Sequence, residues 1–191
     1  MHQSETTLSR LEPVWNRWDH LRHAVVPDGV YYWLRDTGSL TALIKRNCRD
    51  CFSVRVLNQG WGQPLYSERK LLGMRGGEKA IIREVELLCG DLPWVFARTL
   101  IPASSLKGPA RRLTHLGSRP LGEVLFADPK NRRGATEVAR LLPKHSLFRS
   151  ATAGQQKVCR EIWGRRTLFL LANHPLLVNE IFLPEIPEMS R

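Results

Sequence analysis

The sequence has no long apolar run. Its longest uninterrupted runs, such as residues 168–172, are far too short to cross a bilayer, which takes about 20 apolar residues. The N-terminal stretch, MHQSETTLSR, lacks the apolar core of a secretory signal peptide. We therefore expect a cytoplasmic protein without stable membrane insertion.

The sequence also has few features that bind metals or nucleotides. Its six histidines are scattered, without the spacing of a metal motif such as HExxH, and no Ser-His-Asp or Cys-His signature occurs. Cys48 and Cys51 form a CxxC, but no second close pair completes a zinc site and no βαβ pattern surrounds it. We expect all four cysteines to be free thiols, with a metal site or a redox pair as less favoured alternatives. Gly73, Gly76 and Gly77 fit neither GxGxxG nor a P-loop, so no nucleotide is expected.

Acidic residues are scarce. The 18 Asp and Glu stand against 29 Lys and Arg, which gives a formal net charge of +11. Residues 107–166 hold 14 of the basic residues and only 4 acidic ones. Nucleic acid, an anionic membrane surface, an acidic metabolite or simply a solvated basic surface are all compatible with this charge. No aromatic-basic recognition motif accompanies it, so we expect no nucleic-acid partner.

The organisation of the chain predicts one α+β domain. The 191 residues suffice for a sizeable core, and no repeat, low-complexity segment or linker divides them. Helical patterns near the start and strand patterns in both halves, with short turns between strands, favour an antiparallel sheet with flanking helices. We place the domain at residues 9–185, with tails at 1–8 and 186–191.

The hydrophobic periodicity predicts individual elements. The expected helices cover residues 11–26, 39–46, 104–117, 123–126 and 136–142. The expected strands cover residues 53–57, the two halves of 80–102 on either side of a turn at 90–93, and then 158–163, 167–172 and 176–183. Residues 58–64 and 128–134 are expected to be loops, residues 144–157 an exposed segment, and Gly164 a turn.

The stretch 80–102 contains an arginine where a buried residue is expected. Alternate residues of a strand share a face, which places Arg83 beside Val85 and Leu87. A buried guanidinium is costly unless it is paired with a carboxylate of the protein or of a ligand. We therefore predict that Arg83 faces a closed pocket and binds an anion there.

The last predicted strand repeats this pattern with the opposite charge. Glu180 is the only charged residue in the run LLVNEIFL and shares a face with Val178 and Phe182. A structural ion pair and a solvated position are the alternatives to a role in the pocket. Arg98, also within the stretch 80–102, is expected to pair with a carboxylate such as Glu84 and to be structural.

Four segments together resemble the bacterial chorismate pyruvate-lyase family. They are REVELLCGDLPWVFARTLIP (83–102), LGSRPLGEVLF (116–126), IWGRR (162–166) and HPLLVNEIFLP (174–184), in the family's order. The resemblance implies a monomeric enzyme without a metal or cofactor, built on a highly twisted antiparallel sheet with helical flaps over an internal site. It would split chorismate into 4-hydroxybenzoate and pyruvate for ubiquinone biosynthesis.

The resemblance also assigns site residues. The family's carboxylate-binding arginine falls on Arg83, and its site glutamate, near the oxygen of the 4-position, falls on Glu180. A leucine whose backbone amide helps to hold the ring carboxylate falls on Leu121. A methionine of the first flap falls on Leu40, which keeps an apolar side chain there.

The role of Glu180 stays open from the sequence. Apolar neighbours favour its protonated form, which could donate a proton to the ether side, but it could equally accept a hydrogen bond from the product hydroxyl. The alternative function is a non-catalytic domain that binds an aromatic ligand, because the family's fold is similar to effector domains of bacterial repressors. The ligands expected on either hypothesis include 4-hydroxybenzoate; the enzyme also requires chorismate.

Overall fold

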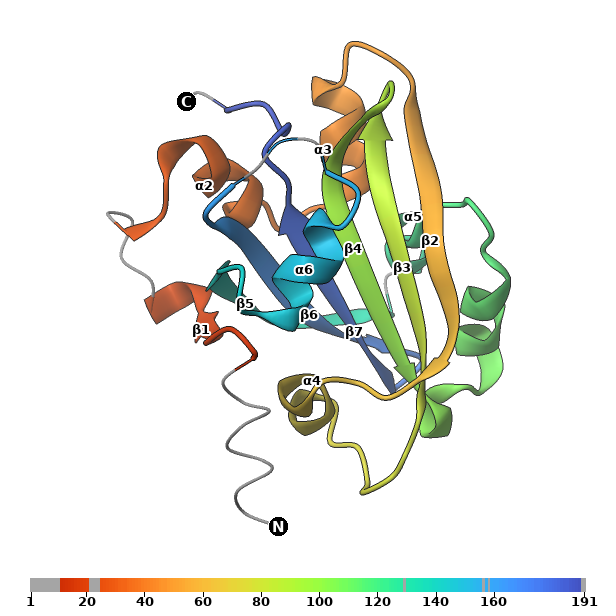
Figure 1. Cartoon of the computed structure of the whole chain (residues 1–191). Coiled ribbons are helices and arrows are strands. Elements are labelled where there is room, and N and C mark those ends of the chain that lie inside the picture. The colour runs from red at the N-terminus through yellow and green to blue at the C-terminus, as the bar shows by residue number, and fades with distance from the viewer. Residues whose placement is uncertain (1–10, 21–24, 129, 156, 158, 190–191) are drawn as a thin grey trace.

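A seven-stranded antiparallel sheet forms the centre of the molecule (Figure 1). The computed structural model describes residues 11–20, 25–128, 130–155, 157 and 159–189. The strand order is β1-β5-β6-β7-β4-β3-β2. The strands are β1 (Asn16–Arg17), β2 (Phe52–Gly62), β3 (Ala80–Cys89), β4 (Leu92–Pro102), β5 (Arg132–Leu141), β6 (Ile162–Leu171) and β7 (His174–Phe182). With the helices that flank the sheet, this confirms the predicted α+β class.

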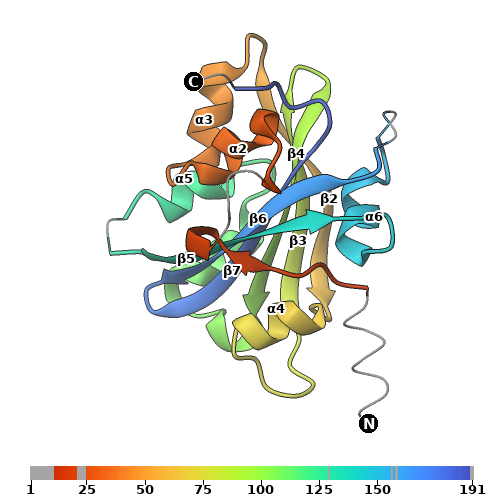
Figure 2. The same ribbon diagram turned by 90° about the vertical axis from the view of Figure 1, so that its left-hand side faces the viewer.

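Helices cover both faces of the sheet (Figure 2). The α-helices are α2 (Asp28–Arg35), α3 (Leu40–Asn47), α4 (Tyr66–Leu71), α5 (Leu121–Leu125) and α6 (Ser146–Thr152), and the 3-10 helices are η1 (Trp18–His20), η3 (Ala103–Ser105) and η4 (Gly108–His115). Apolar residues of α2, α3, α5 and η4 pack against one face. Those of α4 and α6 pack against the other. None of the helices described is long and apolar enough to span a bilayer.

The predicted hairpin at residues 80–102 is confirmed. β3 and β4 pair from Ala80 opposite Pro102 to Cys89 opposite Leu92. Nearly every residue of β3 is buried, because helices cover both faces of this central part of the sheet. Gly90 makes the turn with a positive φ of 58°, a conformation that glycine adopts without steric cost.

The helix predicted at residues 11–26 is wrong where the structure describes it. Residues 16–17 form β1 and pair with β5, and only residues 18–20 make a short 3-10 helix; residues 21–24 lie outside the described part. The buried Glu12 carboxylate accepts the backbone N–H groups of Tyr66 and Ser67, at 2.7 and 2.9 Å. This contact fastens the segment in an extended form to the start of α4. The loop expected at residues 58–64 is also wrong, since β2 continues to Gly62.

Three expectations for residues 128–166 are wrong as well. Residues 132–141 form a strand of the sheet instead of a loop followed by a helix. Residues 146–152 form α6, whose Leu147, Phe148 and Ala151 are buried, so this part of the expected exposed segment belongs to the core. Gly164 lies inside β6, where a Cβ atom would overlap Ile181 Cδ1; the glycine permits close strand packing and makes no turn.

The expectation of four free thiols is also wrong. Cys48 and Cys89 form a disulfide, and Cys51 and Cys159 are free. Cys48 follows the end of α3, while Cys89 ends β3 opposite Phe52 at the start of β2. This topology brings their Cα atoms to 5.6 Å, a usual separation for a disulfide.

Residues 186–189, which were expected to be part of a tail, pack against the core. Ile186 and Met189 contact the apolar cluster that α2 and α3 form with the sheet. The Trp33 indole N–H donates to the Pro187 carbonyl at 2.8 Å. These contacts hold residues 186–189 against the side of the sheet that carries the pocket described below.

Candidate functional site

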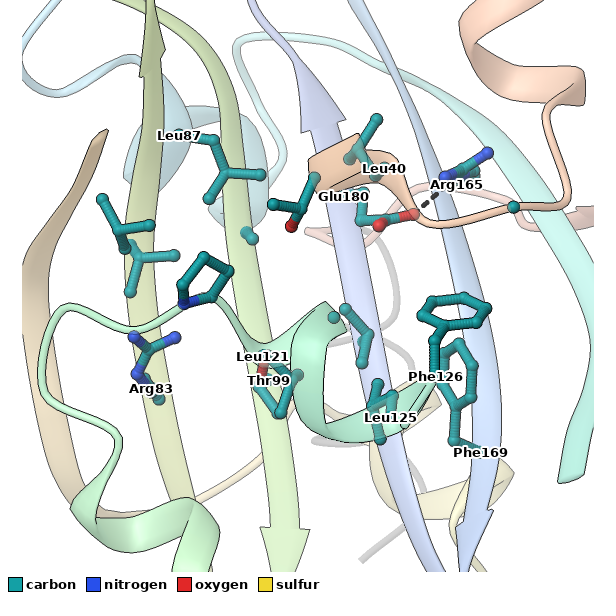
Figure 3. A pocket seen from close by; sticks show the side chains of 18 of the residues that line it. Leu40, Arg83, Leu87, Thr99, Leu121, Leu125, Phe126, Arg165, Phe169 and Glu180 are labelled. Carbon is teal, nitrogen blue, oxygen red and sulfur yellow. Dashed lines mark hydrogen bonds and ion pairs between the residues drawn. The ribbon is translucent and has the colours of Figure 1, made fainter. Parts of the chain in front are cut away.

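A pocket lies between the sheet and the helices α3 and α5 (Figure 3). Its space amounts to about 590 Å³ when the open solvent at its mouth is included. The lining is mostly apolar, with Val85, Leu87, Leu125, Phe126 and Phe169 among its members. All four residues that the family resemblance assigns to a site, Leu40, Arg83, Leu121 and Glu180, line this pocket.

Arg83 lies at one end of the pocket without a carboxylate partner in the described part of the chain. Its side chain is only 4% exposed. One guanidinium nitrogen donates to the carbonyls of Gly117 at 2.8 Å and Arg119 at 3.3 Å, while the buried Nε has no acceptor. Burial lowers the pKa of Arg83. A carboxylate ligand would compensate this desolvation, so the environment of Arg83 suits an anion.

Arg98 on the neighbouring strand has the opposite environment. It donates to Glu68 at 3.0 Å and to Glu84 at 2.6 Å, on the face of the sheet away from the pocket. Burial works against the charged form of Arg98, but the two carboxylates outweigh this effect and raise its pKa. The predicted structural pairing of Arg98 with Glu84 is therefore confirmed.

Glu180 lies at the other end of the pocket and has a cation beside it. Its carboxylate accepts a hydrogen bond from Arg165 Nε at 2.5 Å, across the β6–β7 pair. Arg165 is 1% exposed and also donates to the backbone carbonyls of Trp33 and Asp36. Sequence reasoning placed only apolar neighbours around Glu180. The observed environment instead includes the buried guanidinium of Arg165.

The sheet register sets the separation of Arg83 and Glu180. Arg83 pairs with Thr99, and Ala97, two residues before Thr99, pairs with Glu180. Two strand spacings across and two residues along the strands place the two Cα atoms about 12 Å apart. Both side chains extend over the same face of the sheet and line the same pocket (Figure 3).

Two helices cover the side of the pocket that lies opposite the sheet. Leu40 is the first residue of α3, and Leu121 is the first residue of α5. The helices approach closely at Gly122, where a Cβ atom would lie 3.2 Å from the hydroxyl oxygens of Ser39 and Thr41. The first backbone N–H groups of a helix have no acceptor within it, so the N–H of Leu121 can meet a ligand oxygen.

The sequence reasoning missed two further arginines in the pocket, Arg133 on β5 and Arg165 on β6. Arg165 was in the motif IWGRR, but the turn assigned to Gly164 broke its strand. A continuous strand would have placed Arg165, Thr167 and Phe169 on one face. Arg133 was assigned to a loop. No residue pattern in its segment signals a role in a pocket.

Comparison with known proteins identifies the family. A family model described as chorismate lyase matches residues 10–190. The chain belongs to the chorismate lyase family. A probable chorismate pyruvate-lyase from Methylococcus capsulatus is 44% identical over 154 residues, which span 81% of this chain and 94% of that protein. Another, from Aromatoleum aromaticum, is 43% identical over 166 residues, which span 86% of this chain and 89% of that protein.

Solved structures show that this chorismate lyase chain shares its fold with transcriptional regulators. PhnF from Mycobacterium smegmatis has a TM-score of 0.59 at 12% identity, covering 82% of this chain and 68% of that one. A GntR-family transcriptional regulator from Enterococcus faecalis has a TM-score of 0.50 at 14% identity, and the match covers 75% of this chain and 98% of that one. Structural similarity at such low sequence identity is evidence for a shared fold alone. The effector domain of PhnF has a TM-score of 0.55 at 12% identity, so the predicted likeness to effector domains is confirmed for the fold.

Proposed function

We propose that this protein is a chorismate pyruvate-lyase, which converts chorismate to 4-hydroxybenzoate and pyruvate. The observation that carries the proposal is the buried Arg83, without a carboxylate of its own in the described chain, facing Glu180 across an apolar pocket. Membership of the chorismate lyase family supplies the substrate. The 4-hydroxybenzoate formed would serve ubiquinone biosynthesis, as the family resemblance implies.

The reaction needs no oxidant or reductant. The bond between ring carbon C3 and the ether oxygen breaks, and the oxygen leaves with the enolpyruvyl group. The hydrogen on C4 is lost as a proton, and the ring becomes aromatic while it keeps its 4-hydroxyl. One proton is added to the methylene carbon of the departing enolpyruvate, which gives pyruvate. One proton leaves and one returns, so a single base that later acts as an acid is sufficient.

Arg83 binds the ring carboxylate in this proposal. The planar guanidinium can donate two parallel hydrogen bonds to a carboxylate, and the apolar lining strengthens such a contact by excluding water. The backbone N–H of Leu121 donates to the same group, at the start of α5. Leu40 covers the ring from α3, so the substrate is held between the sheet and two helices.

Glu180 acts at the other end of the ring. C4 is opposite the ring carbon that carries the carboxylate, so a ring held by Arg83 presents C4 and its hydroxyl to Glu180. Arg165 donates a hydrogen bond to the Glu180 carboxylate and thereby fixes its position. We infer that this carboxylate accepts the C4 proton and returns it to the enolpyruvate.

Incubation of the purified protein with chorismate tests the proposal. Chromatography should detect 4-hydroxybenzoate, and a coupled dehydrogenase assay should detect an equal amount of pyruvate. The fold shared with transcriptional regulators favours a second candidate, an effector-like binding domain. If the protein binds 4-hydroxybenzoate but forms neither product, that second function is the correct one.

The Glu180→Gln variant tests the proton step. An amide cannot accept and return the proton, so kcat should fall by about 100-fold or more, while the affinity for 4-hydroxybenzoate changes much less. Glu161→Gln is the matched control, because Glu161 is exposed and pairs with Arg140 on the surface. An unchanged kcat in the Glu180 variant would remove this residue from the chemistry.

A further inference from the structure

Chorismate has a second carboxylate, on its enolpyruvyl group, to which the proposal above assigns no partner. The enolpyruvyl ether is attached to C3, which neighbours C4. If the ring carboxylate lies on Arg83 and C4 lies at Glu180, the second carboxylate must lie at the Glu180 end, displaced to one side of the ring. A cation at that end of the pocket would meet it.

Arg133 is positioned on that side. Its strand β5 pairs with β6, and Arg133 lies opposite Phe169 on the pocket face. The guanidinium carbon is 5.8 Å from the centre of the Phe169 ring. Its polar contacts are the Thr37 carbonyl and, at 3.4 Å, the Thr136 hydroxyl. In the part of the chain that the structure describes, it makes no ion pair.

The other cation at this end of the pocket is already paired. Arg165 donates to the Glu180 carboxylate and to the carbonyls of Trp33 and Asp36. Arg133 lies close enough to Arg165, Glu180 and Asp36 to interact with all three electrostatically. Burial and the Arg165 charge lower the pKa of Arg133, and the carboxylates of Glu180 and Asp36 offset this lowering only in part. An anion beside Arg133 would relieve both of these effects.

The charge of the pocket also fits a dianion. Three arginines, Arg83, Arg133 and Arg165, and one carboxylate, Glu180, are the only charged residues among the described lining residues. Their formal sum is +2. Chorismate carries two negative charges, whereas 4-hydroxybenzoate carries one, so the product leaves one cation without a partner.

We propose that Arg133 binds the carboxylate of the enolpyruvyl group and thereby distinguishes the substrate chorismate from the product 4-hydroxybenzoate. This inference rests on the proposed lyase function. Arg83 contacts the group that substrate and product share, and Arg133 contacts the group that only the substrate has. Cleavage of the ether separates the two contacts, which favours release of the products one at a time.

Two aromatic ligands that cannot react test this assignment. One is 3-(1-carboxyethoxy)-4-hydroxybenzoate, which carries both carboxylates on a ring that is already aromatic. The other is 3-ethoxy-4-hydroxybenzoate, which differs only by the missing second carboxylate. Calorimetry should show that the wild-type protein binds the dicarboxylate about 10- to 100-fold more tightly, as expected for a charge-assisted contact. The Arg133→Gln variant should lose this preference.

The kinetics of the same variant should agree. For Arg133→Gln, kcat/KM for chorismate should fall about 10- to 100-fold, while the dissociation constant of 4-hydroxybenzoate stays within about twofold. Arg133→Lys should recover part of the preference, because it keeps the charge. Arg132→Gln is the matched control: Arg132 is the preceding, exposed residue, contacts Asn173, and should behave as wild type.

The outcomes separate this inference from the lyase function. If the wild-type protein forms no products from chorismate, both proposals are overturned. If it is active but Arg133→Gln keeps the preference for the dicarboxylate, only the role of Arg133 is overturned. Equal losses of affinity for both ligands and for 4-hydroxybenzoate would show that Arg133 merely holds the loop at Thr37, and would also overturn it.

Discussion

Replacement of Arg83 by methionine separates a binding role from a structural one. The substitution removes the charge and keeps an apolar side chain of some length in a position that is 4% exposed. Arg83 has backbone carbonyls as acceptors and no ion pair in the described chain, so its burial is not compensated within the free protein. Affinity and stability should therefore respond in opposite directions.

The structure allows both magnitudes to be estimated. A hydrogen bond to a charged group contributes about 1.5–3 kcal/mol, so loss of the contact with a ring carboxylate should cost about 3 kcal/mol, or roughly a 150-fold weaker Kd for 4-hydroxybenzoate. Replacing a buried charge by an apolar side chain is often neutral or stabilising. Gly117 and Arg119 are exposed, so their carbonyls can turn to water. We expect the free energy of unfolding to rise by about 1 kcal/mol.

Calorimetry with 4-hydroxybenzoate and urea denaturation measure the two quantities. Arg98→Met is the contrasting variant, because it leaves the buried Glu68 without its cation. That variant should lose about 3–5 kcal/mol of stability and keep its affinity. If Arg83→Met binds 4-hydroxybenzoate as tightly as wild type, or is destabilised as much as Arg98→Met, Arg83 is a structural residue and not a binding residue.

Three further predictions concern stability. The free energy of unfolding of Cys48→Ser should be about 4 kcal/mol lower than that of wild type, because the disulfide with Cys89 spans 41 residues. Reductant should destabilise only the wild type, and an equal response of both proteins in urea denaturation would contradict the disulfide. Burial lowers the pKa of His145 below its usual 6.5, so the unfolded chain binds more protons and stability should fall as the pH drops below about 6.5. His145→Gln should reduce that slope in denaturation curves from pH 7.5 to 5, and an unchanged slope would oppose the assignment. Gly164→Ala should cost about 2 kcal/mol and lower the Tm, because the added methyl group overlaps the end of the buried Ile181 side chain and crowds the Glu180 carbonyl. An unchanged Tm would show that the Ile181 side chain can turn away.

The parts of the site on unbroken apolar strands could be predicted from the sequence. Arg83 and Glu180 each interrupt a run that is otherwise apolar, and the alternation of a strand then fixes the face on which each lies. Leu121 was found through the turn that begins α5 and through the family motif. These signals are local, so they need no knowledge of the neighbouring strands.

The rest of the site could not be predicted from the sequence, because it depends on packing between segments that are distant in the chain. Gly164 is a glycine because β7 passes close to it, and a single sequence cannot distinguish this use of glycine from a turn. That ambiguity concealed Arg165, the partner of Glu180. Arg133 lies in a strand whose first residues are largely exposed, without the regular alternation that would mark a strand. Its role emerges only when β5 is paired with β6.

The helix predicted for the N-terminal segment was wrong for a different reason. Trp15, Trp18, Leu21 and Val25 have helical spacing, but each tryptophan has its own distant partner. Trp15 packs under the guanidinium of Arg166, and Trp18 packs against Tyr31. Helical spacing is therefore an insufficient guide where large aromatic residues contact separate parts of a fold.

A crystal structure of the complex with 4-hydroxybenzoate would show whether Arg83 binds the ring carboxylate. The ring should lie between the sheet and the helices α3 and α5. Its carboxylate should lie within hydrogen-bond distance of the Arg83 guanidinium and the Leu121 N–H, and its hydroxyl should contact the Glu180 carboxylate. A ring bound outside this pocket, or bound with its carboxylate at Glu180 and its hydroxyl at Arg83, would contradict it.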